Sequence, residues 1–300
     1  MFLNVLFLLV LFTFFMQVSS FINLFKSILG KPTNKNISKT VPLNDIYECA
    51  KLSELAYEFD YVFKSRENNK YLECINHNNI KCPDCNFIKF IKNKTNLHCL
   101  ITKNDKSKKY IVIFKGTSKL VNWIYNVKMR KMNLNDNLKK NSYVHLGFYL
   151  QLMQDDVIGQ IQEVISDAPD DYDVWFCGHS AGGAHSVLSS YILAKKFPFK
   201  DIKTFTFASP RIGNKNFAEN FSKVKNLEHW RVSYGNDIFT AVPLINYHHF
   251  GNSLRLSKNK VEYGDYNKFY TFSVLKCFSF FDHHPKFYTR ELEKLLKFKK

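Results

Sequence analysis

The chain has 300 residues, of which 45% are hydrophobic and 16% aromatic, and its formal net charge is +17. This length is enough to bury one substantial core, which favours one α/β domain, or two at most. The charge favours an anionic partner, but the chain has no arginine-rich stripe and no known nucleic-acid-binding module, which excludes nucleic acid. A solvated basic surface, or attraction to anionic lipid, accounts for the charge.

The N-terminus has the pattern of a targeting segment. Residues 2–16 are apolar except for Asn4 and Thr13, and small residues follow at 18–20. This pattern predicts a secretory signal peptide over 1–20 and a mature protein outside the cytosol. A retained anchor is the alternative, because the apolar run is only slightly shorter than a membrane span. A loose segment over 21–43 and a single domain over 44–300 complete the predicted organisation.

Seven cysteines are consistent with an oxidising compartment. Cys177 lies in a predicted apolar strand, where a free cysteine behaves as a small hydrophobic residue, so we expect it to be unpaired. The other six can form three disulfides, whose pairing the sequence does not determine: Cys49, Cys74, Cys82, Cys85, Cys99 and Cys277.

Apolar periodicity predicts strands that alternate with helices for most of the chain. Helices are expected over 44–59, 150–165, 181–197 and 217–224, with a further helix at the C-terminus; strands are expected over 87–91, 97–102, 110–114, 174–177, 204–207 and 230–234. This alternation predicts a largely parallel sheet with both faces covered.

A sharp turn between strand 174–177 and the next helix carries a serine. Gly178 and Gly182 flank Ser180 in a G-x-S-x-G pattern, whose glycines permit a turn that presents the serine at the top of a sheet. The serine hydroxyl becomes nucleophilic when a histidine accepts its proton and a carboxylate orients that histidine. In this arrangement the carboxylate and then the histidine follow the serine along the chain.

Asp237 is the expected carboxylate, because it comes just after the strand predicted at 230–234. Asp201, Asp265 and Asp282 are alternatives in polar surroundings. Later histidines are His248, His249, His283 and His284. His249 precedes another apolar segment and suits a structural role, whereas His283 and His284 lie in a loop before the last helix, and chemistry alone does not choose between them.

The oxyanion of an acyl-transfer intermediate needs two N–H donors. We expect them at Ala181, directly after the serine, and at Thr117, just after strand 110–114. Leu120, Trp123, Ile124 and Val127 then follow at helical spacing. They predict a short amphipathic helix, which we interpret as a lid that opens at a lipid surface; packing into the core is the alternative.

Together these motifs resemble the class 3 lipase family, the fungal-lipase-like branch of the α/β-hydrolases, over residues 44–300. In order, the similar motifs are Phe114-Lys115-Gly116-Thr117, Asn122-Trp123, Val144-His145-Leu146-Gly147-Phe148, Gly178-His179-Ser180-Ala181-Gly182-Gly183-Ala184, Ala208-Ser209-Pro210-Arg211-Ile212-Gly213-Asn214, and Asn236-Asp237-Ile238 with Pro243. The G-x-S-x-G pattern alone is weak, but the ordered set is specific.

The resemblance implies an α/β-hydrolase fold, with a mostly parallel central sheet flanked by helices and a short helical lid. It also implies an oxyanion donor at Thr117 and a lid over 120–127. The family's last motif is similar to H-x-x-Y-F, and residues 284–288 match it with the two aromatic residues exchanged. The resemblance therefore favours His284 over His283 as the base.

The expected function is that of a secreted serine carboxylester hydrolase, a triacylglycerol lipase-like enzyme that cleaves acylglycerol esters through an acyl-enzyme. Its chemistry needs no metal or organic cofactor. Expected partners are a small-molecule ester and a lipid–water interface or membrane surface, including an anionic one. A phospholipase A1-type activity on anionic phospholipids is one alternative, and a non-catalytic lipid- or partner-binding protein with the same fold is another.

Overall fold

This computed structural model describes residues 41–58, 85–117, 131–134, 141–243, 246–258, 260–263 and 279–298. The predicted signal peptide lies outside these ranges. So do the lid residues Leu120, Trp123, Ile124 and Val127, the candidate Asp265, and the cysteines Cys74, Cys82 and Cys277.

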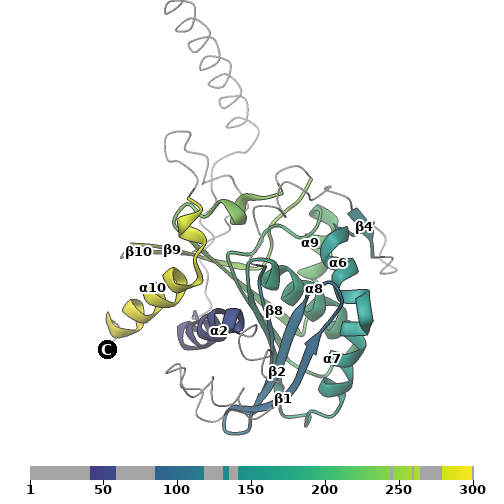
Figure 1. The fold of residues 1–300 in the computed structure, drawn as a ribbon. Helices are drawn as coiled ribbons and strands as arrows, with labels where there is room; N and C mark the ends of the chain where they lie inside the picture. The colour runs from purple at the N-terminus through teal and green to yellow at the C-terminus, as the bar shows by residue number, and fades with distance from the viewer. Residues whose placement is uncertain are drawn as a thin grey trace, which may run out of the picture.

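An eight-stranded sheet forms the centre of the molecule (Figure 1). Its strands, in spatial order, are β1 (Cys85–Lys92), β2 (His98–Asn104), β3 (Lys109–Phe114), β6 (Asp173–His179), β7 (Ile202–Phe207), β8 (Leu227–Tyr234), β9 (Asn252–Ser257) and β10 (Lys260–Tyr263). The five strands from β3 to β9 are parallel, and both edges of the sheet are antiparallel. β4 (Lys131–Asn133) and β5 (Tyr143–His145) form a separate antiparallel pair.

Helices cover both faces of this sheet, as Figure 1 shows. One face packs against α2 (Leu43–Leu55) and α10 (Pro285–Phe298); the other packs against α6 (Leu146–Met153), α7 (Val157–Ser166), α8 (Ala181–Lys196) and α9 (Lys215–Phe221). All six residues of β3 are buried, as expected for a strand covered on both sides. This arrangement confirms the predicted α/β fold with a mostly parallel sheet. Within the described residues, no helix has the length and apolarity to cross a membrane.

Short 3₁₀ helices connect several elements: η1 (Ala56–Glu58), η2 (Gln154–Asp156), η3 (Ile238–Ala241) and η4 (Phe281–His283). The single helix predicted over 150–165 is interrupted by η2. Asp155 and Asp156 have φ of 54° and 51°, in the left-handed region that stops an α-helix. The Asp156 carboxylate then accepts a hydrogen bond from the backbone N–H of Gly159 (3.2 Å) and caps α7.

Two of the six cysteines expected in disulfides are free thiols. Cys49 of α2 and Cys99 of β2 are buried and unbridged, as is Cys177, whereas Cys85 is disulfide-bonded. Burial raises the pKa of the Cys49 and Cys99 thiols well above the usual range. The expectation of three disulfides is therefore wrong, because Cys49 and Cys99 serve as small apolar residues in the two core layers.

Candidate active site

Ser180 occupies the turn between β6 and α8. It is buried, with φ of 59° and ψ of −126°, a backbone conformation that is uncommon for a residue with a side chain. A Cβ atom on Gly182 would clash with the Phe114 carbonyl oxygen, and one on Gly178 would clash with the Gly182 carbonyl. The glycines therefore allow α8 to begin directly against β3 and β6, and this contact fixes the position of Ser180.

Asp237 follows β8, at the same carboxyl edge of the parallel sheet as Ser180. Its side chain is 0% exposed, and its Oδ1 accepts a hydrogen bond from the backbone N–H of Phe239 (2.9 Å) at the start of η3. A carboxylate that caps a helix in this way has a fixed orientation.

His283 lies against Asp237. Its Nδ1 is 2.9 Å from Asp237 Oδ2 and 3.0 Å from Oδ1. Because an ionised carboxylate can only accept, Nδ1 carries the proton and donates, which leaves Nε2 with a free lone pair. His283 Nε2 and Ser180 Oγ are both buried, and neither has a hydrogen-bond partner among the described residues.

His284, the histidine favoured from the sequence, does not reach Asp237. It is exposed, with φ of −68° and ψ of 128°, and its Nδ1 accepts a hydrogen bond from the backbone N–H of Lys286 (3.3 Å). The residue before a proline is disfavoured in the helical region, and Pro285 begins α10. The expected contact of His284 with Asp237 is thus corrected to His283.

Two aromatic residues complete the surroundings of this pair. The Tyr288 hydroxyl donates a 2.6 Å hydrogen bond to Asp237 Oδ2 and accepts one from the backbone N–H of Tyr234 (3.2 Å). Burial, and then the Asp237 charge, raise the pKa of Tyr288 well above its usual value, so Tyr288 remains a donor. The Phe239 ring packs on the His283 imidazole, with centroids 3.9 Å apart. Sequence patterns alone did not point to Tyr288 or Phe239 as neighbours of the candidate site.

His179 and Tyr57 form a further layer under the turn. The Tyr57 hydroxyl and His179 Nδ1 are 2.7 Å apart, and the His179 ring centroid is 4.6 Å from that of His283. Burial, and then the charge of His283, hold the pKa of His179 well below its usual range, so His179 is neutral. A Cβ atom on Gly116 would clash with the Tyr57 hydroxyl. Tyr57 therefore packs closely against the loop that carries Thr117.

The two predicted oxyanion donors, Thr117 and Ala181, lie at the same edge of the sheet. Phe114 of β3 pairs with Gly178 of β6, so Thr117 and Ala181 both come just after the paired ends of these strands. Ala181 is the first residue of α8, where backbone N–H groups have no partner within the helix. This placement is compatible with an oxyanion hole, and the role of both residues stays a prediction.

Asp282, which the sequence offered as an alternative to Asp237, instead bonds to the backbone just before Asp237. Its Oδ2 accepts a hydrogen bond from the backbone N–H of Asn236 (2.8 Å), and the Ser279 N–H donates to the Asn236 carbonyl (3.1 Å). These bonds tie the segment that carries His283 to the segment that carries Asp237.

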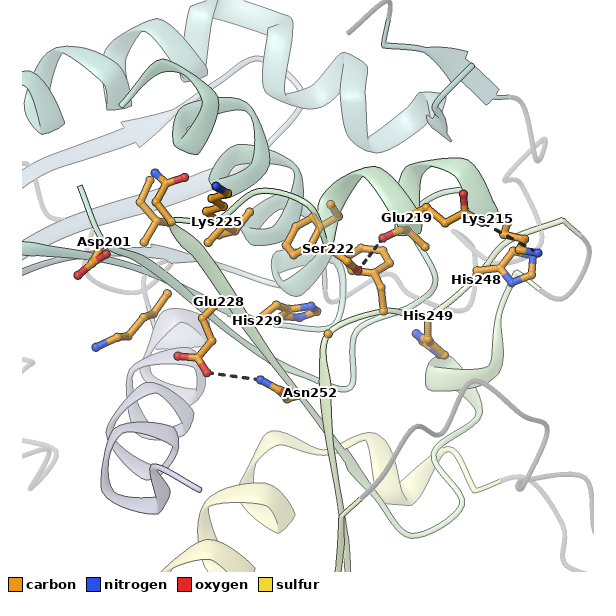
Figure 2. A pocket seen from close by; sticks show the side chains of 18 residues that line it. Asp201, Lys215, Glu219, Ser222, Lys225, Glu228, His229, His248, His249 and Asn252 are labelled. Carbon is orange, nitrogen blue, oxygen red and sulfur yellow. Dashed lines mark hydrogen bonds and ion pairs between the residues drawn. The ribbon is translucent and has the colours of Figure 1, made fainter. Parts of the chain in front are cut away.

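A hollow of about 790 Å³ lies elsewhere, at the amino ends of β7 and β8 (Figure 2). The remaining alternatives Asp201, His248 and His249 line it, whereas Ser180, Asp237 and His283 do not. His249 also lies 2.6 Å, through Nε2, from the Thr240 carbonyl oxygen, in keeping with a structural role. Among the described residues, no group of three or more His, Cys, Asp or Glu side chains is placed to hold a metal ion.

Comparison with known proteins gives a consistent result. Residues 111–247 match the family model described as Lipase (class 3). A secreted mono- and diacylglycerol lipase A of Penicillium cyclopium is 28% identical over 138 residues, which are 45% of this chain and 43% of that protein. Over residues 111–247 this chain is therefore similar to the class 3 lipase family. Secreted mono- and diacylglycerol lipase 1 of Fusarium solani is 29% identical over 187 residues, 61% of this chain and 53% of its own length.

Further similarities are to a solved structure and to a plant phospholipase. Lipase II from Rhizopus niveus, a solved structure, has a TM-score of 0.68 at 23% identity and covers 82% of this chain and 94% of its own; this likeness establishes the α/β-hydrolase fold. Phospholipase A1-IIgamma of Arabidopsis thaliana is 29% identical over 115 residues, 35% of this chain and 27% of that protein. The curated relatives thus match over only part of their own length.

Proposed function

We propose that this chain is a secreted serine carboxylester hydrolase that cleaves acylglycerol lipids. The observation that carries the proposal is the buried bond between Asp237 and His283, whose ring lies 4.6 Å from that of His179, the residue before Ser180. The Ser180 hydroxyl and His283 Nε2 are both buried and lack a partner among the described residues. The order Ser, Asp, His along the chain is that of α/β-hydrolases. The names of the fungal relatives support acylglycerols as substrates.

In the proposed mechanism, Ser180 Oγ attacks the ester carbonyl while His283 Nε2 takes its proton. Asp237 holds the imidazole through Nδ1 and stabilises the cation that forms. The Thr117 and Ala181 amides bind the oxyanion. The imidazolium then protonates the departing glycerol oxygen as the C–O bond breaks, and a water molecule, activated by His283, hydrolyses the acyl-enzyme.

The proposal also includes export of the protein from the cell and a lid over the active site. The apolar run at 2–16 and the secreted relatives support export. The helix expected at 120–127 is proposed to cover the site in water and to open at a lipid surface. If the Trp123→Ala variant lost activity on emulsified and soluble esters equally, a lid role would be excluded.

Phospholipase A1-type hydrolysis is the second candidate. The net charge of +17 favours anionic lipid surfaces, and the Arabidopsis thaliana relative supports a phospholipid substrate. The two candidates share the same residues and differ only in the lipid that reaches Ser180.

One experiment tests both candidates. The protein and its Ser180→Ala variant are given emulsified triacylglycerol, anionic phospholipid vesicles and a soluble short-chain ester, and released fatty acid is measured. We expect the Ser180→Ala variant to be inactive on every substrate that the parent protein cleaves. Equal behaviour of the two proteins on all three substrates would leave a non-catalytic binding protein as the explanation.

A further inference from the structure

A groove of about 540 Å³ lies between α2 and α10, on the flank next to the His283 segment. Its walls include Tyr47 and Lys51 of α2 and Lys286, Phe287 and Arg290 of α10. We call it the α2–α10 groove. It is separate from the hollow shown in Figure 2, with which it shares no lining residue.

Cations lie over aromatic rings on both walls of the groove. Lys51 Nζ is 4.9 Å from the centroid of the Tyr47 ring, and the Arg290 guanidinium carbon is 4.9 Å from that of Phe287. Such stacking leaves the N–H groups of the cation available to an anion. The groove therefore presents positive charge from two helices toward one space.

Of the two acidic residues of the groove, Glu293 is in an ion pair and Glu54 accepts a hydrogen bond from a neutral hydroxyl. Glu54 accepts a hydrogen bond from the Thr289 hydroxyl (2.8 Å), and Glu293 pairs with Lys297 (2.8 Å). Lys51 and Lys286 have no carboxylate partner among the described residues. The charge of Lys51 acts on Glu293 without an ion pair. Arg290 Nε lies 3.3 Å from Glu291 Oε1, which leaves the terminal N–H groups of Arg290 on the ring face. An incoming anion would therefore find the two ammonium groups beside these terminal N–H groups.

An exposed aromatic pair lies on the chain just before this groove. Phe281 is 85% exposed and Phe280 is 54% exposed, whereas the neighbouring His283 is 8% exposed. The bond of His283 to Asp237 turns that side chain inward, whereas Phe281 faces outward and Phe280 packs with one side against the Phe239 ring (centroids 6.0 Å apart). An exposed aromatic pair beside a basic groove has the composition of a membrane contact, in which apolar rings and cations lie together.

We propose that the α2–α10 groove binds the phosphate of an anionic phospholipid while Phe281 enters the adjacent lipid surface. This proposal rests on the proposed action at a lipid surface, and it assigns the contact to a segment that is continuous with His283. Aromatic insertion together with basic residues is the usual composition of a surface that lies on a membrane. Arginine and lysine donate to phosphate oxygens through short, charge-assisted hydrogen bonds.

The test measures vesicle binding in the Ser180→Ala background, so that no lipid is hydrolysed. Partition onto phosphatidylcholine vesicles, with and without phosphatidylglycerol, is measured by sedimentation for the Lys286→Gln/Arg290→Gln variant. Because each basic residue near an anionic surface contributes about five-fold in affinity, we expect roughly 25-fold weaker binding to the anionic vesicles and little change on neutral ones. Circular dichroism and urea midpoints check that the variants fold.

A control variant, Lys195→Gln/Lys196→Gln, removes the same charge at the C-terminal end of α8, far from Ser180. Equal losses in the two double variants would show that only net charge matters and would overturn the groove assignment. Phe281→Ser should weaken binding to neutral and anionic vesicles alike, and unchanged binding would remove Phe281 from the surface. Because binding is measured without Ser180, an absence of hydrolysis in the parent protein would defeat the proposed function and leave this result intact.

Discussion

The Tyr288 hydroxyl donates a 2.6 Å hydrogen bond to Asp237 Oδ2, the same oxygen that lies 2.9 Å from His283 Nδ1. The carboxylate is thus held from two sides, by the proposed base and by a residue of α10. Since Asp237 is fully buried, each of these donors replaces water that the carboxylate has lost.

Tyr288→Phe removes only this hydroxyl. We expect kcat/KM on a soluble ester to fall by roughly 10-fold, the effect of losing one hydrogen bond to a buried charged group. The matched control is Tyr247→Phe, because the Tyr247 hydroxyl is buried without a hydrogen-bond partner among the described residues. If both variants kept parental kcat/KM, the Tyr288 bond would have no part in positioning Asp237.

Asp282 should act as a positioning residue, because it ties the His283 segment to Asn236. In Asp282→Ala we expect kcat to fall about 10-fold at nearly constant KM, since a small displacement of a catalytic group slows the reaction strongly. Asp282→Asn keeps an oxygen that accepts the Asn236 N–H and should restore most of the rate. Asp171→Ala, which breaks an exposed ion pair with Lys108, is the control. A fall in KM alone, or no rescue by asparagine, would contradict a positioning role.

Gly182→Ala places a methyl group against the Phe114 carbonyl oxygen, which the backbone of β3 holds in place. We expect a loss of about 3 kcal/mol or more in the free energy of unfolding, because two backbone segments must separate. In Gly159→Ala the obstructing atoms belong to the Asp156 side chain, which can rotate away, so the loss should be about 1 kcal/mol. Urea unfolding of the two variants compares them directly, and equal losses would contradict the close contact at Gly182.

Buried histidines should make the fold sensitive to acid. Burial lowers the pKa of His145 to about 4 and the pKa values of His185 and His229 to about 3. Below pH of about 6.5 the unfolded chain therefore binds protons that the folded chain excludes, so the free energy of unfolding decreases as pH falls toward 4. Each such histidine contributes about 1.4 kcal/mol per pH unit to the slope.

Urea unfolding between pH 4.5 and 7.5 measures that slope. His185→Gln keeps a donor for Gln151, to which His185 Nε2 bonds at 3.0 Å, and removes one titrating group. The dependence of the free energy of unfolding on pH should then be shallower by the contribution of one proton, about 1.4 kcal/mol per pH unit. A free energy of unfolding that did not change with pH would contradict the neutral, buried state of these histidines.

Much of the fold follows from local pattern. Strand β3 and helix α8 lie within two residues of their predicted ends, because apolar runs and the glycines around Ser180 determine them. The interruption at Asp155 and Asp156 was missed, since the apolar periodicity continues across it. The free state of Cys49 and Cys99 was missed because pairing depends on which core layer each cysteine enters.

The candidate site also combines residues that local sequence pattern predicts with residues that only the folded structure brings together. Ser180 and Asp237 could be predicted as site residues because each follows a strand at a recognisable turn, and their catalytic roles stay a prediction. Similarity to the H-x-x-Y-F motif favoured His284, but the residue before Pro285 is extended and exposed in the structure, and the adjacent His283 is the one that reaches Asp237. Tyr57 lies 122 residues before His179 in the chain, so only the folded structure brings the two side chains together.

His283, held by Asp237, is the proposed base for Ser180. The most direct test is kcat/KM on a soluble short-chain ester for His283→Ala and His284→Ala, measured side by side on folded protein. We predict a loss of about 1,000-fold or more for His283→Ala, as for other triad histidines, and a change within about 3-fold for His284→Ala. The reverse order, with His284→Ala inactive and His283→Ala active, would contradict the account.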